Sequence, residues 1–350
     1  MPALPPVIAG AMTPEVRERV ESFYSSVAAI FEAWVNRRKS HHTRRAYRGD
    51  VMAFAEFRRI VWPRDAAELL RTSILDVQAF KDHMGKHGGA PKTINRRISS
   101  LSSFYRFLSG AAAELRLPIT VPNPAHAQFI GREASDPVEE TRALSETRAR
   151  QLMAMVTGES LLELRDRAIL KFYLYTGARI ETGCALNVGD FHQDGDEATV
   201  RFHLKGNRTK TKGIHFAAAD AIAEYLHAAG IESGPLFRPR RSKYKDEISV
   251  RRLTQRAMYD ILMGYLSRLP GALQEKEVIG KEGKPTGEKV QVCVYSPHSI
   301  RATTATLLLD AREPIESVQE LLDHKHITTT QIYDKRRRSV RDSASHKVPI

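Results

Sequence analysis

Cysteine is nearly absent from the sequence, which contains Cys184 and Cys293 in 350 residues. Two cysteines cannot build the disulfide framework of a small secreted protein, so we expect a reducing compartment. No apolar run approaches the roughly 20 residues that a membrane-spanning helix needs. The N-terminal residues also lack the basic start and apolar middle of a signal peptide. These absences predict a cytoplasmic protein with no membrane segment.

The two signs of charge are unequally represented. Lys and Arg number 54 against 41 Asp and Glu, which leaves a net charge of +13 and a pI near 9.8. This excess favours a polyanionic partner, either nucleic acid or an acidic membrane surface, because neutralised phosphates release condensed counterions. A length of 350 residues predicts two domains rather than one.

The first part of the chain has helical periodicity. Within residues 91–109, apolar side chains recur at steps of three and four, at Ile94, Ile98, Leu101, Tyr105 and Leu108. Residues 40–62 behave alike, with one apolar face made by Tyr47, Val51, Phe54 and Val61. With further helices near 14 to 37 and 73 to 86, the pattern predicts a four-helix unit over residues 1–116.

The opposite faces of two of these helices are basic. A basic helix face is often only solvated surface, but on a chain of this net charge we expect it to contact phosphates. The predicted DNA-binding residues are Arg44, Arg45, Arg48, Lys92, Asn95 and Arg96.

Residues 117–142 contain four prolines and little periodicity, which is typical of an interdomain linker. The second domain, residues 143–350 with a C-terminal tail, mixes helices and short strands. Residues 196–217 predict a strand, a Gly-Asn turn and a second strand, and residues 276–296 predict an exposed hairpin or mobile loop. The expected fold is therefore mostly α with a small β-sheet.

Four separated segments carry side chains suited to phosphate chemistry. They contain Arg179; Lys205; His298 with Arg301; and His324 with Tyr333. Each is a weak signal alone, but the ordered set resembles the tyrosine recombinase family, also called phage integrases. The most specific piece is His298-x-x-Arg301 followed by His324 and, nine residues later, Tyr333. The resemblance covers about residues 14 to 335 and implies a helical SAM-like core-binding domain before a catalytic domain.

The resemblance also implies a role for each of these residues. Arg179 corresponds to the first catalytic arginine, Lys205 to the lysine of the β-hairpin, and His298 with Arg301 to the central pair. His324 corresponds to the second histidine and Tyr333 to the nucleophile, which would form a 3′-phosphotyrosine link. In that family, four protomers on two double-stranded DNA sites exchange strands, accessory DNA-bending or directionality proteins can assist, and residues after the tyrosine pack on a neighbouring protomer.

Elementary chemistry supports these assignments. Cleaving a phosphodiester through a covalent intermediate needs a nucleophile, positive charge around two oxygens, and a proton for the leaving oxygen. Two guanidiniums, from Arg179 and Arg301, can hold a phosphate bidentately without losing charge. His298 is the candidate acceptor of the tyrosine proton, and Lys205 is the candidate acid, with Lys210 and Lys212 as alternatives on the same hairpin.

Three positions depart from the family pattern: Thr182, where an acidic residue is usual; Ala302, often histidine; and Asp323, commonly glycine. The stretch ending at Tyr333 also predicts its own local structure. Thr328 and Gln331 have capping-box spacing, so a short helix is expected to start there, with Ile332 as its packing residue.

Two other functions compete with recombination. A metal-dependent nuclease would use the acidic cluster of Asp190, Asp194 and Asp196, although neighbouring glycines favour a turn there. A catalytically silent DNA-binding regulator could share the fold, but every reactive residue type is present. We therefore expect a cytoplasmic, nucleoid-associated bacterial recombinase that needs no metal or cofactor. It would integrate, excise or resolve a mobile element or replicon.

Overall fold

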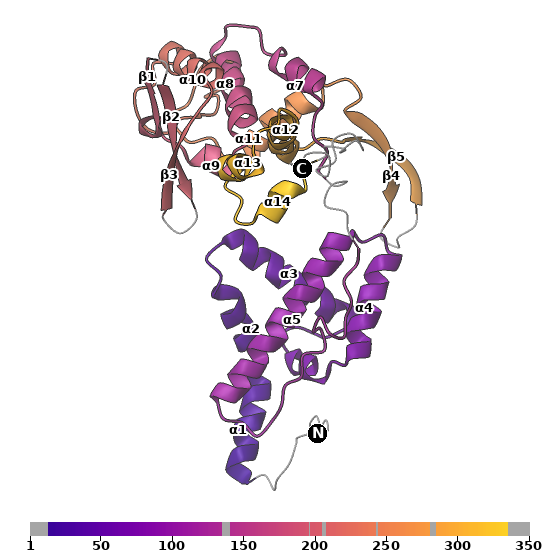
Figure 1. Cartoon of the computed structure of the whole chain (residues 1–350). Helices are drawn as coiled ribbons and strands as arrows, with labels where there is room; N and C mark the ends of the chain where they lie inside the picture. The colour runs from indigo at the N-terminus through magenta and orange to yellow at the C-terminus, as the bar shows by residue number, and fades with distance from the viewer. Residues whose placement is uncertain are drawn as a thin grey trace, which may run out of the picture. The chain divides into compact units, whose positions relative to one another are not determined.

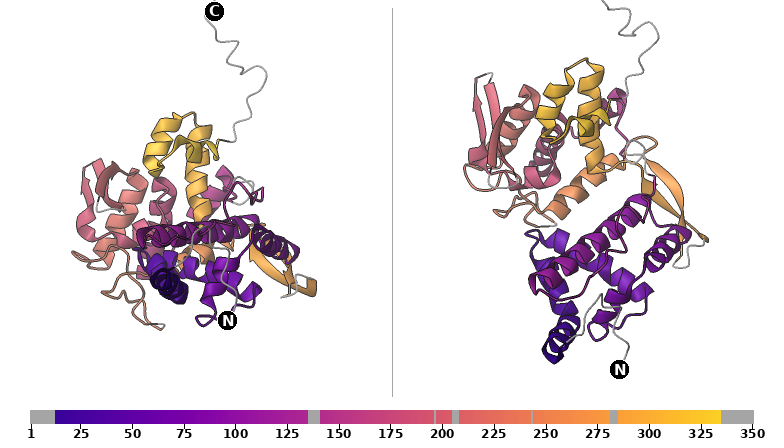
Figure 2. Two further views of the ribbon diagram at one scale, coloured as in Figure 1. Left: turned by 90° about the horizontal axis from the view of Figure 1, so that it is seen from below. Right: turned by 60° about the horizontal axis from the view of Figure 1, so that its bottom comes forward.

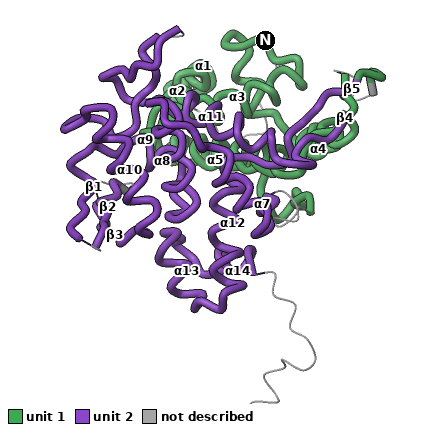
Figure 3. Tube along the Cα trace, turned by 90° about the horizontal axis from the view of Figure 1, so that it is seen from above, with its two compact units in different colours: residues 1–135, 277–288 green, residues 136–276, 289–350 purple. Residues whose placement is uncertain are grey.

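The structure is a computed structural model that describes residues 13–134, 141–195, 197–204, 208–242, 244–280 and 285–334. The chain divides into two compact units (Figure 3). The first contains residues 1–135 and 277–288, and the second contains residues 136–276 and 289–350. The break between residues 135 and 136 falls within the proline-rich segment 117–142.

The first unit is built from helices (Figure 1). In chain order they are α1 (Pro14–Ser25), α2 (Val27–Asn36), α3 (His41–Phe57), the 3-10 helix η1 (Ala66–Arg71), α4 (Ile74–Lys86) and α5 (Pro91–Glu114). Their starts follow from local sequence. Ser40 and Ser73 each accept a hydrogen bond from a first-turn amide, and proline begins α5 where no amide hydrogen is needed.

Aromatic packing fills the core of this unit. Trp34 of α2 is fully buried, stacks on Tyr47 of α3 and touches Phe104 of α5. The predicted apolar face of α5 is buried as expected, at Ile94, Ile98, Leu101, Tyr105 and Leu108. The prediction for Val61 was wrong. α3 ends at Phe57, so Val61 leaves the helical stripe and is 50% exposed.

The second unit combines helices with short antiparallel strands. Its helices are α7 (Glu146–Met153), α8 (Leu161–Thr176), α9 (Ile180–Ala185), η2 (Val188–Asp190), α10 (Phe216–Ala228), α11 (Gln255–Leu266), α12 (Pro297–Asp310), α13 (Ile315–Leu322) and α14 (Ile327–Gln331). Its three-stranded sheet has the order β1 (Phe191–Asp194), β2 (Glu197–Leu204), β3 (Arg208–Gly213). A separate pair joins β4 (Leu273–Ile279) to β5 (Pro285–Cys293), and residues 277–288, which include the end of β4 and the start of β5, belong to the first unit.

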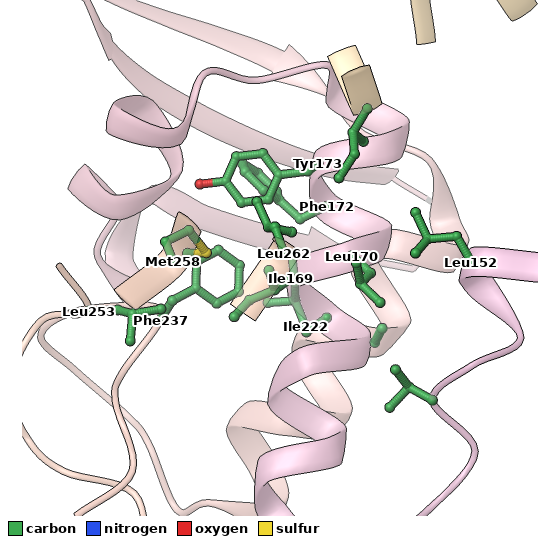
Figure 4. Packing of buried hydrophobic residues seen from close by; sticks show 14 of the residues in the cluster. Leu152, Ile169, Leu170, Phe172, Tyr173, Ile222, Phe237, Leu253, Met258 and Leu262 are labelled. Carbon is green, nitrogen blue, oxygen red and sulfur yellow. The ribbon is translucent and has the colours of Figure 1, made fainter. Parts of the chain in front are cut away.

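Helix α8 is the centre of the second unit, because α10 and α12 both pack against it. Its Phe172 and Tyr173 lie among side chains from α10, α11 and the loop carrying Phe237 (Figure 4). α13 and α14 lie together beside α12, in the yellow part of the chain (Figure 2). These contacts bring the ends of α8 and α13 to the start of α12, where the reactive residues are found.

The predicted fold class is confirmed: the chain is mostly helical with small antiparallel sheets. The strands on either side of the predicted Gly-Asn turn exist as β2 and β3, and residues 276–296 contain β5 and the end of β4. The sequence analysis did not predict β1. Phe191 is the only side chain of this strand that is not exposed, so the strand lacks the alternation of apolar and polar residues that predicts a half-buried strand. In the described residues, no helix is long and apolar enough to cross a membrane. Cys184 and Cys293 are both free.

Candidate active site

The first turns of α12 place two reactive side chains on one face. Ser296 and Ser299 form a reciprocal capping box and Pro297 occupies the first turn, so the start of the helix is well defined. His298 and Arg301 are three residues apart and therefore project from the same side. They differ in environment, because His298 is exposed whereas Arg301 is 3% exposed.

Arg301 is held by carbonyl groups from two other segments. Its Nη1 donates to Gly177 O at 2.6 Å, just beyond α8, and its Nη2 donates to Leu322 O at 2.5 Å, at the end of α13. Its Nε is buried without a partner among the described residues. Since a guanidinium has five N–H groups, the side chain keeps donors for an incoming anion. Burial and the nearby charge of Arg179 lower the pKa of Arg301 to about 10, which leaves it charged at neutral pH.

Arg179 follows a sharp chain reversal. Gly177 ends α8 in the left-handed conformation, with φ of 58°, and Arg179 occupies the N-cap position of α9. Arg179 is exposed. With Arg301, Thr182 and Asp323, it lines a small hollow of about 20 Å³. Two guanidiniums thus border one hollow, where their positive charges favour an anionic oxygen.

Tyr333 lies against His298. The Tyr333 hydroxyl is 3.3 Å from His298 Nε2, although the two residues are 35 positions apart in the sequence. The tyrosine is 8% exposed. Burial raises the pKa of its hydroxyl, and the charges of Arg301 and Arg179 oppose that rise. A hydroxyl in this setting stays protonated until a neighbouring base accepts its proton.

The local prediction around Tyr333 was wrong in two respects. α14 begins at Ile327 with His326 at its N-cap, so Thr328 lies inside the helix rather than capping it. Tyr333 is itself a packing residue, whereas Ile332 is only half-buried. The apolar cluster around the tyrosine contains Ala302, Ala305, Leu309, Val318 and Leu322. The ring is therefore fixed by the core, and its hydroxyl lies next to His298.

His324 stands directly after α13. Asp323 ends that helix in the left-handed conformation, with φ of 54°, and the His324 ring stacks on the Tyr333 ring at 6.0 Å. His324 Nδ1 is 2.9 Å from Thr330 Oγ1. Burial, followed by the charge of Arg301, lowers the pKa of His324 to about 4, so the ring is neutral at pH 7. If Nδ1 accepts from Thr330, the neutral ring carries its proton on Nε2.

The three hairpin lysines have different surroundings. Lys205, the predicted acid, lies outside the described residues. Lys210 of β3 forms an ion pair with Glu320 at 2.9 Å. Lys212, further along the same strand, donates to the backbone carbonyls of Glu320 and Leu321 at 3.0 and 2.6 Å. Both described ammonium groups are therefore bound to α13.

Three of the predicted DNA-binding side chains take part in contacts within the first unit. Arg48 makes a two-pronged ion pair with Glu32. Arg96 pairs at 2.6 Å with the buried carboxylate of Asp50. Asn95 exchanges two hydrogen bonds of 2.9 Å with the backbone of residue 133.

The other three predicted DNA-binding residues lie at the starts of α3 and α5. Arg45 and Lys92 are exposed. Arg44 is half-buried, and its Nε has no partner among the described residues. These residues are placed where a ligand could reach them.

A second basic surface of the first unit was missed by the sequence analysis. Two adjoining hollows of about 230 and 580 Å³ run along α5 and share Ser103 and Arg106. Arg37 and Arg38 line the larger one. No carboxylate among the described residues pairs with Arg37, Arg38 or Arg106. The signal was present in the sequence, because neither Arg37 nor Arg106 has an acidic residue three or four positions away.

The described residues of the acidic cluster considered for a nuclease do not form a metal site. Asp190 accepts from Arg201 Nε at 3.1 Å and is 2.9 Å from His203 Nε2, and it also accepts from the amide of Asn187. Its carboxylate holds η2 against β2. Asp196 lies outside the described residues. In the ranges that the structure describes, no group of three or more His, Cys, Asp or Glu side chains could hold a metal ion.

A tyrosine in contact with a histidine, together with two arginines whose charges act on that tyrosine, supplies the groups that phosphodiester cleavage through a covalent intermediate requires. The fold and site together define the class of enzymes that cut and rejoin nucleic acid strands through a tyrosine. The phage integrase family model matches residues 142–339, and the N-terminal SAM-like domain model of phage integrases matches residues 32–111. The chain therefore belongs to the phage integrase family, the tyrosine recombinases, which cleave and rejoin DNA at specific sites.

Named relatives match most of the chain. "Tyrosine recombinase XerC" of Roseiflexus castenholzii is 28% identical over 91% of this chain and 88% of its own length. "Tyrosine recombinase XerD" of Lacticaseibacillus casei is 30% identical over 73% of this chain and 76% of its own length.

Two solved structures share the fold. XerH recombinase, in a post-cleavage complex with a palindromic difH substrate, has a TM-score of 0.63 at 15% identity, covering 90% of this chain and 93% of that one. A lambda integrase dimer bound to a COC′ core site has a TM-score of 0.61 at 15% identity, covering 95% of this chain and 85% of that one.

Proposed function

We propose that Tyr333 is the nucleophile of this recombinase and that it forms a 3′-phosphotyrosine link to one DNA strand. The observation that carries the proposal is the 3.3 Å separation between the Tyr333 hydroxyl and His298 Nε2, next to the charges of Arg179 and Arg301. The hydroxyl has both a proton acceptor and the positive field that favours a phenolate.

The reaction balances without a cofactor. The Tyr333 oxygen bonds to phosphorus while the bond from phosphorus to the 5′ oxygen breaks. The tyrosine proton passes to His298, and the departing 5′ oxygen takes a proton from a lysine, for which Lys205 remains the candidate. Arg179 and Arg301 hold the two non-bridging oxygens. Because the phosphotyrosyl ester keeps the bond energy, a 5′ hydroxyl of the partner strand can reverse the step without ATP.

Neutral His324 suits the remaining task. A neutral ring adds no charge to a site that already contains two arginines, yet it can donate one N–H to a phosphate oxygen. Its contact with Thr330 Oγ1 orients the ring. We therefore assign His324 as a hydrogen-bond donor to the phosphate and not as a proton shuttle.

A suicide substrate tests the nucleophile directly. Duplex DNA with the recombination site and a nick near the cleavage position is incubated with the chain and run on a denaturing gel. We expect a covalent protein–DNA species that forms in the presence of chelator and is absent from Tyr333→Phe, while DNA binding by that variant is retained. Cleavage that needs divalent metal and survives Tyr333→Phe would favour the nuclease. Binding of the true site without cleavage would favour the silent regulator.

The partner is double-stranded DNA, and the working assembly is a homo-tetramer on two sites, acting within the bacterial cytoplasm on nucleoid DNA. XerH and the lambda integrase dimer, both bound to DNA sites in their structures, share the fold and support this proposal. Accessory DNA-bending or directionality proteins would choose between integrating, excising or resolving a mobile element or replicon.

The first unit would bind the DNA backbone, and the two adjoining hollows along α5, called the arginine groove here, extend the predicted contacts. Arg37 lies over the Phe107 ring, with its guanidinium 5.0 Å from the ring centre, and Arg38 lies over Tyr47 at 4.9 Å. Aromatic support fixes each guanidinium plane while its N–H edge stays available. Together with Arg106, and with Arg44, Arg45 and Lys92 elsewhere in the unit, these side chains form the basic surface for DNA phosphates. The ion pairs and hydrogen bonds of Arg48, Arg96 and Asn95 within the first unit hold its helices and loops in place.

A further inference from the structure

Lys212 belongs to β3 but reaches the end of α13. Its Nζ donates to Leu321 O at 2.6 Å and to Glu320 O at 3.0 Å, across more than a hundred residues of sequence. It also lies 5.5 Å from the centre of the Phe202 ring on the neighbouring strand. Lys212 therefore links a strand to the end of a helix, because both of these hydrogen bonds go to backbone carbonyls.

Two cations share the carbonyls at the end of α13. The last carbonyls of a helix have no partner within it. Lys212 donates to those of Glu320 and Leu321, and Arg301 donates to that of Leu322, while the Asp323 amide also donates to Glu320 O at 3.2 Å. Three consecutive carbonyls are thus held by side chains from β3 and α12. Positive charge at a helix C-terminus is also favoured by the helix dipole.

His324 depends on this helix end for its place. Its amide donates to Gln319 O at 3.1 Å, and Gln319 Nε2 donates back to His324 O at 3.0 Å. The backbone of His324 is therefore fixed to the last turn of α13. A shift of that turn would therefore displace the His324 ring from its stacked position on Tyr333.

The surroundings of Lys212 disfavour the charged form of its side chain. Burial lowers the pKa of Lys212 to about 8, although the charge of Asp323 opposes the shift. Lys210, two residues earlier, keeps its ammonium on the exposed carboxylate of Glu320. A half-buried ammonium that lines the same hollow as Arg179 and Arg301 indicates a functional location rather than an ordinary surface contact.

We propose that Lys212 is a positioning residue, which links the β2–β3 hairpin to the C-terminus of α13. Through this link it holds His324 where the ring can donate a hydrogen bond to the phosphate bound by the two arginines. This inference rests on the proposed function. It also separates the roles of the hairpin lysines, because an ammonium bound to two carbonyls is not free to follow a departing 5′ oxygen. Lys212 acts through α13, whereas the acid acts on the leaving group.

A substrate with sulfur in place of the bridging 5′ oxygen distinguishes the two roles. A thiol has a pKa of about 8.5, so a thiolate leaves without a proton donor and restores activity lost with a general acid. Displacement of His324 is not repaired in this way. We expect Lys212→Met to slow covalent-complex formation by about 10- to 100-fold on both substrates, the loss typical of misplaced catalytic groups. Lys205→Met should be slow on the oxygen substrate only.

Two matched variants control for charge and folding. Lys212→Arg keeps donors for the carbonyls and is expected to recover most of the rate. Lys210→Met removes the same charge from the same strand, but its exposed ion pair contributes little, so rates within about threefold of the parent are expected. If Lys212→Met recovers the parent rate of covalent-complex formation on the sulfur substrate, Lys212 is the general acid. If the rate of Lys212→Met equals that of the parent on both substrates, the proposal is contradicted.

Amide hydrogen exchange tests this link without any catalysis. We expect faster exchange in residues 321–324 of Lys212→Met, and protection close to the parent in Lys212→Arg. If the parent chain forms no covalent complex, the proposed function fails, yet exchange still decides whether Lys212 holds α13. Unchanged protection in Lys212→Met would show that it does not.

Discussion

The neutral state of His324 makes the second unit sensitive to acid. The ring is 8% exposed and stacks on Tyr333, and burial with the nearby charge of Arg301 lowers its pKa from 6.5 to about 4. An unfolded chain returns the imidazole to its ordinary pKa. Between about pH 4 and 6.5 the unfolded state therefore binds more protons than the folded state, and stability is lost as the pH falls through this window.

The size of the effect follows from the two pKa values. Between about pH 7 and pH 4.5, this single group removes about 2 kcal/mol of the free energy of unfolding. His324→Gln keeps a polar side chain opposite Thr330 but cannot titrate. The stability that the parent loses over this pH range should therefore exceed the loss in His324→Gln by about 2 kcal/mol.

Guanidinium titrations at the two pH values, followed by far-UV circular dichroism, measure this difference. Both tryptophans of the sequence, Trp34 and Trp62, lie in the first unit, so fluorescence reports the unfolding of that unit separately. The fluorescence transition should respond to pH equally in parent and variant. Equal pH-dependent losses in the circular dichroism transition would refute the buried, neutral state of His324.

Two further predictions concern backbone conformation and DNA binding. Gly177→Ala should destabilise the chain by about 1–2 kcal/mol, because alanine would have to adopt the left-handed conformation of this glycine. The loss should be larger than for Gly230→Ala, because Gly230 has the same φ of 58° but open space around it. A Cβ at Gly177 would lie 2.4 Å from the last leucine of α13, so thermal unfolding and covalent-complex assays should both show the excess. Arg37→Gln and Arg106→Gln should each lower the slope of log K against log salt by about 1. Arg64→Gln, an exposed arginine already paired with a carboxylate, should leave the slope unchanged, and equal slopes in all three would count against the groove.

Helical periodicity predicted the first unit well because its contacts are largely those of amphipathic helices. The apolar stripe of α5 needed only the sequence from Ile94 to Leu108. The ion pair of Arg96 with Asp50 joins residues 46 positions apart, so no local sequence pattern predicts it. The two predicted basic faces therefore include side chains, such as Arg96, that hold α3 on α5.

The site shows the same division between local and distant information. The spacing from His298 to Arg301 predicted a shared helix face, and the helix is present. The burial of Tyr333 could not be read from its neighbours, because the cluster that covers it comes from α12 and α13. The carbonyl partners of Arg301 lie 124 and 21 residues away, so they became visible only in the fold.

Two of the departures from the family pattern meet in one place. Thr182, which stands where an acidic residue is usual, and Asp323, which stands where glycine is usual, both line the hollow beside Arg179 and Arg301. The left-handed φ of 54° explains a preference for glycine at position 323, and aspartate is among the residues that tolerate it. Its charge raises the pKa of Lys212 and of Arg301 against the effect of burial. The carboxylate at the end of α13 therefore balances part of the positive charge of the cations that line the hollow.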